Sequence, residues 1–154
     1  MLTTEEIHEI EKEFEKFPQK RAACIEALRI VQKNRRWIDD QLLKDIAGLL
    51  EMTVHELDSV ATFYNMIFRR PVGRNIIHVC DSVTCYMMGC NRIIDDIKEA
   101  LKIDMGETTG DERFTLLSNS CMGLCDKPPA IMINNDVYVN VDVNNLSALL
   151  NTYK

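Results

Sequence analysis

The sequence predicts an α+β or α/β chain in two parts, a helical bundle over residues 1–70 and a mixed domain over residues 71–154. Apolar residues recur at helical spacing through the first part. After Pro71, short runs rich in β-branched residues alternate with amphipathic segments, in the order β-α-β-β-β-α. With 154 residues, of which 46% are hydrophobic, the chain is long enough to bury a core.

The first part is predicted to contain four helices. The first begins in a capping box at Thr3 and is broken by Pro18. The third begins after a cap at Asp39 or Asp40, and the fourth begins in a second capping box at Thr53. The residues expected on the apolar faces are, in chain order, Ile7, Ile10, Phe14, Phe17, Cys24, Ala27, Leu28, Val31, Leu42, Leu43, Ile46, Leu49, Leu50, Val54, Leu57, Ala61, Tyr64 and Phe68.

The second part is predicted to begin with a strand over 75–80, followed by one amphipathic helix over 87–103 and a second strand over 113–120. Residues 130–141 predict a hairpin around an Asn-Asn-Asp turn, and 144–154 predict a final helix. A right-handed crossover makes the first two strands parallel neighbours. Their carboxyl ends therefore lie at the same edge of the sheet, where α/β proteins usually bind ligands.

Four of the six cysteines follow these two strands in closely spaced pairs. Cys80 and Cys85 form C-x4-C, and Cys121 and Cys125 form C-x3-C. The predicted topology brings the two pairs together. Thiolate is a soft ligand that suits zinc, Cu(I) or iron–sulfur clusters, and a [2Fe–2S] cluster takes four cysteines. The pattern therefore favours an iron–sulfur site.

A structural zinc site stays open at this point, because its cysteine pairs are usually spaced by two to four residues. Dithiol exchange is disfavoured, since neither pair is C-x-x-C. We expect Cys85 to lie at the start of the helix over 87–103, where backbone N–H groups favour thiolate. Cys24 and Cys90 are expected to be packing residues. His78 is expected to be an ordinary strand or core histidine.

Composition excludes several kinds of partner. The net charge of −6 disfavours a surface for nucleic acid or anionic membrane, because such surfaces concentrate Lys and Arg. No apolar stretch approaches the length of about 18 residues that spans a bilayer, and the N-terminus is acidic, unlike a targeting segment. These features predict a cytoplasmic protein, where thiols stay reduced and grouped cysteines suggest a metal site.

Three stretches carry a resemblance to a known family. "CDSVTC" (80–85), "CMGLCDKPP" (121–129) and "VATFYNMIF" (60–68) resemble the thioredoxin-like [2Fe–2S] ferredoxin component of NADH:quinone oxidoreductase, respiratory complex I, known in bacteria as its E subunit. The resemblance covers nearly the whole chain. It implies a helical N-terminal region followed by a thioredoxin-like domain, with one [2Fe–2S] cluster bound by Cys80, Cys85, Cys121 and Cys125. Cys90 is not a ligand in that family.

The resemblance also implies an assembly. The expected partner is a flavoprotein subunit that binds FMN and NADH, beside other hydrophilic subunits, so the chain carries no catalytic residues and neither of those cofactors. The chain would be peripheral to the inner membrane through the complex, without inserting into it. We expect the N-terminal helices to dock on the flavoprotein. NAD-linked hydrogenases and formate dehydrogenases use the same type of subunit, and the ligands do not separate these assemblies.

Overall fold

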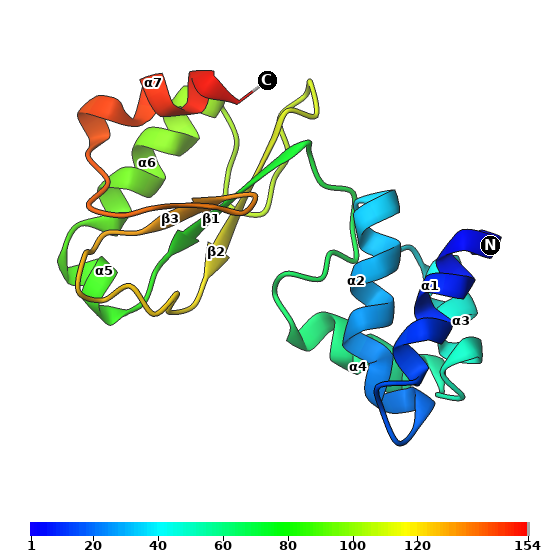
Figure 1. The fold of residues 1–154 in the computed structure, drawn as a ribbon. Helices are drawn as coiled ribbons and strands as arrows, with labels where there is room; N and C mark the ends of the chain where they lie inside the picture. The colour runs from blue at the N-terminus through cyan, green and yellow to red at the C-terminus, as the bar shows by residue number, and fades with distance from the viewer. Residues whose placement is uncertain (154) are drawn as a thin grey trace. The chain divides into compact units, whose positions relative to one another are not determined.

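A computed structural model describes residues 1–153. The chain forms two compact units, residues 1–71 and the residues from Val72 onward (Figure 1). The first unit is entirely helical, and the second contains the only sheet found among the described residues. No helix within residues 1–153 is long and apolar enough to cross a membrane. The mixed class, with helices preceding an α/β arrangement, is as predicted.

The N-terminal unit consists of four α-helices and one short 3₁₀ helix, Lys20–Ala23. All the predicted caps are present. Thr3 and Thr53 each open a capping box, and Asp39, not Asp40, is the N-cap that accepts a hydrogen bond from the Leu42 N–H at 2.7 Å. The α-helices are α1 (Thr4–Phe14), α2 (Cys24–Arg35), α3 (Asp40–Leu49) and α4 (Val54–Phe63).

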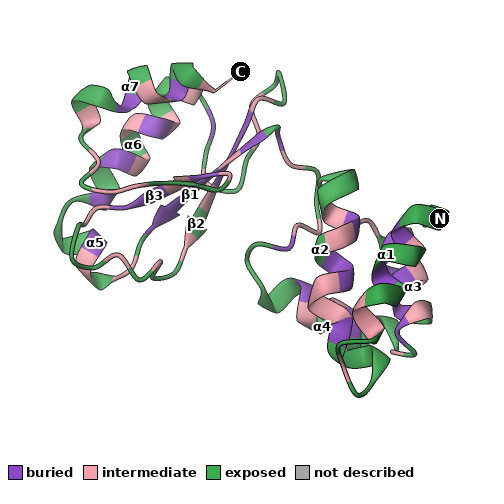
Figure 2. Ribbon diagram, in the orientation of Figure 1, coloured by how far each residue is buried: buried purple, intermediate pink, exposed green. Residues whose placement is uncertain are grey.

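One face of each of these helices is buried in a shared core (Figure 2). The predicted face of the fourth helix is wrong at its carboxyl end, because α4 ends at Phe63 and Tyr64 is extended and exposed. The side chain of Gln32 explains this ending. Its amide donates to the Met66 carbonyl at 2.8 Å and accepts from the Phe68 N–H at 2.6 Å, so α2 holds the following segment as a loop.

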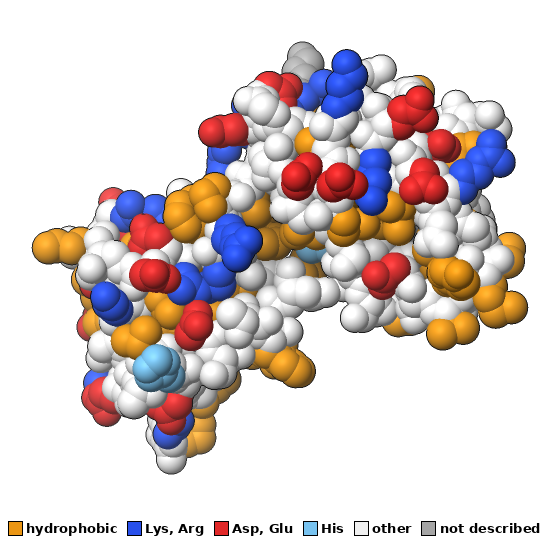
Figure 3. Space-filling view, turned by 180° about the vertical axis from the view of Figure 1, so that it is seen from behind, with side chains coloured by type: hydrophobic (Ala, Val, Ile, Leu, Met, Phe, Trp, Pro, Cys, Tyr) orange, Lys and Arg blue, Asp and Glu red, His pale blue; other side chains and the backbone are white. Residues whose placement is uncertain are grey.

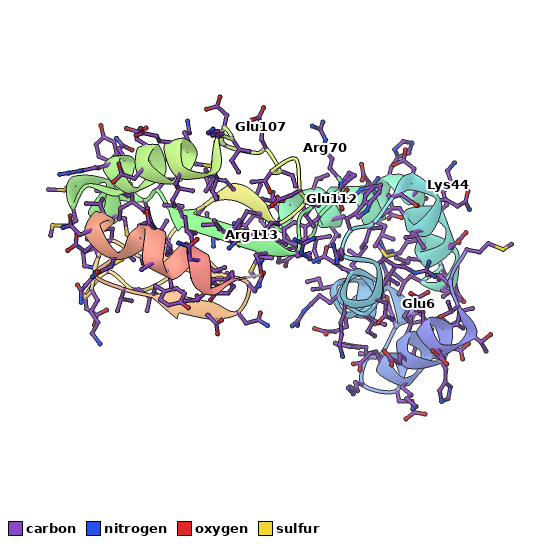
Figure 4. The ribbon with its side chains drawn as sticks, turned by 90° about the horizontal axis from the view of Figure 1, so that it is seen from above. Glu6, Lys44, Arg70, Glu107, Glu112 and Arg113 are labelled. Carbon is purple, nitrogen blue, oxygen red and sulfur yellow. The ribbon has the colours of Figure 1, made fainter. Side chains whose placement is uncertain are left out.

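A buried carboxylate joins two helices of this unit. Glu6 is only 1% exposed, although it also belongs to the first capping box. Figure 4 labels Glu6 among the helices of the N-terminal unit. Its carboxylate accepts hydrogen bonds from Arg35 Nε at 2.9 Å and from the Thr3 N–H at 2.8 Å. The hydrogen bond from Arg35 is the main reason that the pKa of Glu6 is lowered. α1 is therefore tied to the end of α2 by a charged contact as well as by apolar packing.

The second unit is a four-stranded sheet in the order β2-β1-β3-β4. β1 and β2 are parallel, and β1 pairs antiparallel with β3, which forms the predicted hairpin with β4. Figure 1 shows α6 and α7 together on one side of this sheet. The elements are β1 (Asn75–Cys80), α5 (Val83–Met87), α6 (Cys90–Leu101), β2 (Phe114–Asn119), β3 (Ile131–Ile133), β4 (Asp136–Tyr138) and α7 (Val143–Thr152).

The helix predicted over 87–103 is α6, which begins later, at Cys90, and a separate short helix, α5, precedes it. Gly89 separates α5 from α6 and adopts φ +90°, a left-handed conformation that favours glycine. The periodicity of α6 was predicted correctly, since Ile93 and Ile97 are buried against the sheet. The predicted start of this helix, at residue 87, was wrong. The chain turns at Gly89 before α6 begins, and apolar spacing does not reveal such a turn.

Candidate metal centre

The two cysteine loops leave the same edge of the sheet. Cys80 is the last residue of β1, and its register partner on the parallel strand β2 is Asn119, two residues before Cys121. The pairing continues one residue further, because the Asp81 N–H donates to the Asn119 carbonyl at 3.1 Å. The crossover predicted from sequence is thus present, and it starts both loops side by side.

The first loop supplies a buried pair of thiols, which we call the inner pair. Cys80 and Cys85 are 2% and 3% exposed. Burial raises the pKa of Cys85 to about 11, and a hydrogen bond with Cys80 adds to the effect. Cys85 is the third residue of the five-residue helix α5, so it lies in a first helical turn as predicted, but in a short helix that precedes α6 and not at the start of the longer one. A bound cation would have to stabilise the Cys85 thiolate, because the surrounding core favours its neutral thiol.

The second loop supplies an exposed pair, which we call the outer pair. The Sγ atoms of Cys121 and Cys125 are 3.4 Å apart. The Gly123 N–H lies 3.3 Å from Cys121 Sγ, and this hydrogen bond is the main reason that the pKa of Cys121 is lowered. Gly123 adopts φ +78°, a conformation that turns its N–H back toward the sulfur. The glycine between the two cysteines therefore supports a thiolate here.

The two pairs lie within electrostatic reach of each other. The pKa of Cys125 is raised first by Cys121, and the charge of Cys80 contributes as well, while a hydrogen bond from the Thr84 side chain opposes the rise. Residue Ala130, which the sequence did not single out, supports the inner pair. Its carbonyl accepts from the Cys80 N–H at 3.1 Å, and its backbone also interacts with the Cys85 thiol.

The donor set fits a two-iron cluster. A tetrahedral metal with metal–sulfur bonds of about 2.3 Å separates two thiolates by about 3.8 Å. The outer pair is already close to that spacing at 3.4 Å. Within residues 1–153, no group of three or more Cys, His, Asp or Glu is placed to hold one ion. Two adjacent pairs of soft donors match the requirement of [2Fe–2S] for two cysteines per iron.

The two other cysteines and His78 are the remaining residues that the sequence brought into consideration. Cys24 is half-buried and packs against the helical core of the N-terminal unit, as expected for a packing residue. Cys90 is fully buried and packs with Cys80 and Cys85. His78 is 1% exposed, and burial lowers its pKa, so its imidazole is neutral at pH 7.

An apolar surface adjoins the inner pair. Figure 3 shows hydrophobic side chains gathered at the end of the second unit where α5 lies. These side chains flank Cys85 in sequence but point outward, unlike its buried thiol. This surface was not predicted from the sequence, although consecutive large apolar residues there were a visible signal. The exposed members are Val83, Tyr86, Met87 and Met88.

Comparison with known proteins points to one family. The family model described as thioredoxin-like [2Fe-2S] ferredoxin matches residues 10–154. The chain is 50% identical to the E subunit of the NADH-quinone oxidoreductase of Buchnera aphidicola, over 99% of this chain and 94% of that protein. Proteins of the same name from Pseudomonas aeruginosa and Escherichia coli K12 are 44% and 43% identical, each over 99% of this chain and 92% of theirs.

A solved structure has a fold similar to that of this chain. One polypeptide of an NAD+-reducing [NiFe]-hydrogenase in the air-oxidized state matches with a TM-score of 0.72 and 27% identity. The match covers 84% of this chain but only 22% of the hydrogenase polypeptide. The likeness therefore concerns one part of a larger polypeptide in that enzyme.

Proposed function

This chain belongs to the thioredoxin-like [2Fe–2S] ferredoxin family, and on that premise we propose that it is an electron-transfer subunit of an NADH-quinone oxidoreductase. The proposal rests on one observation above all. Two cysteine pairs, separate in sequence, start from neighbouring ends of parallel strands and form adjacent two-thiol sites. Relatives named as the E subunit of that oxidoreductase match over 99% of the chain.

We assign the cluster ligands as the inner pair, Cys80 and Cys85, and the outer pair, Cys121 and Cys125. Each pair would hold one iron. The chain's own contribution is to present four thiolates, to bury two of them in an apolar cluster, and to donate the Gly123 N–H to one sulfur of the exposed pair. When bound, a [2Fe–2S] cluster supplies one-electron transfer. Burial and hydrogen bonds to sulfur are the levers by which the protein sets its reduction potential.

The proposed electron partner is the FMN of a flavoprotein subunit that also binds NADH. The N-terminal unit supplies a surface suited to docking on that flavoprotein. Phe63, Tyr64 and Met66 are all exposed, with Phe63 at 79%, and the two aromatic rings are packed edge to face with centroids 5.3 Å apart. Exposed aromatic and methionine side chains are enriched in protein interfaces. Through such contacts the chain would be cytoplasmic and peripheral to the inner membrane.

A second assembly is supported by the hydrogenase likeness. An NAD+-reducing hydrogenase contains a segment of the same fold at 27% identity. The relatives named for NADH-quinone oxidoreductase are considerably closer, at 43% identity or more over nearly the full chain. Identification of the proteins that co-purify with this chain from its native cells separates the two assemblies.

Metal analysis of the anaerobically purified protein tests the cluster itself. We expect two irons and two acid-labile sulfides per chain, a reddish-brown colour, and a spin-half EPR signal after reduction. The competing possibility is a structural zinc module with the same four cysteines. Colourless protein with one zinc per chain would contradict the electron-transfer proposal and support the zinc module.

A further inference from the structure

The site contains one more thiol than a [2Fe–2S] cluster requires. Cys90 is the first residue of α6 and is 0% exposed. It belongs to the same buried cluster as the inner pair, together with Ala130. Four cysteines are already assigned as ligands, so the presence of a fifth sulfur against two of them needs a separate explanation.

Cys90 borders both members of the inner pair. Cys80, Cys85 and Cys90 are each at most 3% exposed and pack in one buried cluster, so the three side chains lie together beneath the surface. Four partly buried apolar side chains pack against this cluster: Ile94, Met122, Leu124 and Val139.

The backbone between Cys85 and Cys90 is short and contains a glycine with a positive φ. Only Tyr86, Met87, Met88 and Gly89 separate the two cysteines. Gly89 adopts φ +90°, and a Cβ placed there would meet no atom within 4 Å. This corner between α5 and α6 therefore has free space around it, and glycine has the widest choice of backbone angles. Cys90 follows this corner directly, as the first residue of α6.

The outer pair has no comparable neighbour among the described residues. Cys121 and Cys125 lie in an exposed loop, and the one cysteine outside the site, Cys24, packs against the core of the N-terminal unit. The fifth thiol therefore lies beside the inner pair, and the two pairs differ in whether another cysteine packs next to them.

On the basis of the proposed cluster function, we propose that Cys90 is a reserve ligand that takes the place of Cys85 when the Cys85 thiol is lost. In this exchange the S–H bond of Cys90 breaks, its sulfur binds iron, and the proton goes to solvent. No electron is gained or lost. The donor set would still comprise four thiolates, with Cys90 in place of Cys85.

The test compares five full-length proteins, each purified anaerobically: wild type, Cys85→Ala, Cys90→Ala, Cys85→Ala with Cys90→Ala, and Cys121→Ala. We expect Cys85→Ala to retain a [2Fe–2S] cluster with a shifted EPR spectrum and shifted visible bands. The double variant and Cys121→Ala should each bind iron at least about tenfold less well. Cys90→Ala alone should keep the wild-type spectrum, because Cys90 is not a ligand while Cys85 is present.

Loss of the cluster from Cys85→Ala, or equal retention in the double variant, would overturn the reserve role. Far-UV circular dichroism checks that each variant is folded. If Cys85→Ala is unfolded, the same comparison with Cys85→Val decides the matter, since valine cannot bind iron and the criterion is whether the cluster depends on Cys90. A wild-type protein without any cluster would instead contradict the proposed function, so the two failures are distinguishable.

Discussion

The thiols of Cys121 and Cys125 lie 3.4 Å apart on an exposed loop, whereas the thiols of Cys80 and Cys85 are buried. The exposed pair has no further cysteine beside it to replace a missing member within the described chain. We therefore expect Cys125→Ala to abolish the cluster, with loss of the visible absorption and the EPR signal of the reduced protein. Cys24→Ala is the matched control and should leave both spectra intact. A normal EPR signal from Cys125→Ala would contradict the ligand assignment.

The buried Glu6 predicts a pH dependence in the N-terminal unit. The pKa of Glu6 is lowered in the fold, so its carboxylate stabilises the unit above its ordinary pKa of about 4.3 to 4.5. This contribution is lost as the pH falls through the folded value. Glu6→Gln should cost about 1–3 kcal/mol at pH 7 and reduce the loss of stability on acidification.

Hydrogen exchange of the α1 amides, measured between pH 7 and pH 3 and corrected for the intrinsic exchange rate, reports the stability of the N-terminal unit. Glu9→Gln is the matched control, because Glu9 lies on the same helix but is exposed. An unchanged pH profile in Glu6→Gln would show that the contact with Arg35 does not contribute.

Close backbone packing before β1 predicts that Gly73 does not tolerate a side chain. A Cβ at this position would lie 2.9 Å from the carbonyl carbon of Phe114 and 3.0 Å from the carbonyl oxygen of Glu112. Both are backbone atoms and have little freedom to move. Gly73→Ala should lower the free energy of unfolding of the second unit by about 1–3 kcal/mol.

Gly110→Ala provides the comparison, because a Cβ there meets nothing within 4 Å and the residue has no positive φ. We expect its effect to stay within about 0.5 kcal/mol. Thermal unfolding of the apo and cluster-bound proteins measures both variants. Equal stability of the two alanine variants would argue against close packing at Gly73.

The aromatic surface of the N-terminal unit predicts a loss of binding without a loss of folding. Phe63 is 79% exposed, so Phe63→Glu removes little buried area within the unit. If this surface binds the proposed flavoprotein partner, Phe63→Glu should weaken co-purification with that partner by about tenfold or more, as expected for an aromatic residue at the centre of an interface. His8→Glu places the same charge on an exposed position of α1 and should bind normally. Full binding by Phe63→Glu would exclude this surface from the interface.

Local patterns were sufficient for much of the fold. Both capping boxes and the strand over 75–80 were predicted from neighbouring residues, because caps and short β-branched runs depend on side chains a few positions apart. The parallel pairing of β1 with β2 also followed from sequence, since the handedness of the crossover leaves few alternatives. The break at Gly89 did not follow, because apolar spacing continues across it.

For the site, the sequence by itself determined which thiols are paired along the chain and that both pairs follow strands. Only the tertiary structure decided that Cys80 and Cys85 are buried while Cys121 and Cys125 are exposed, and that Cys90 packs against the buried pair. The physical reason is that spacing is a local property. Burial and electrostatic reach depend instead on which distant segments pack over each loop.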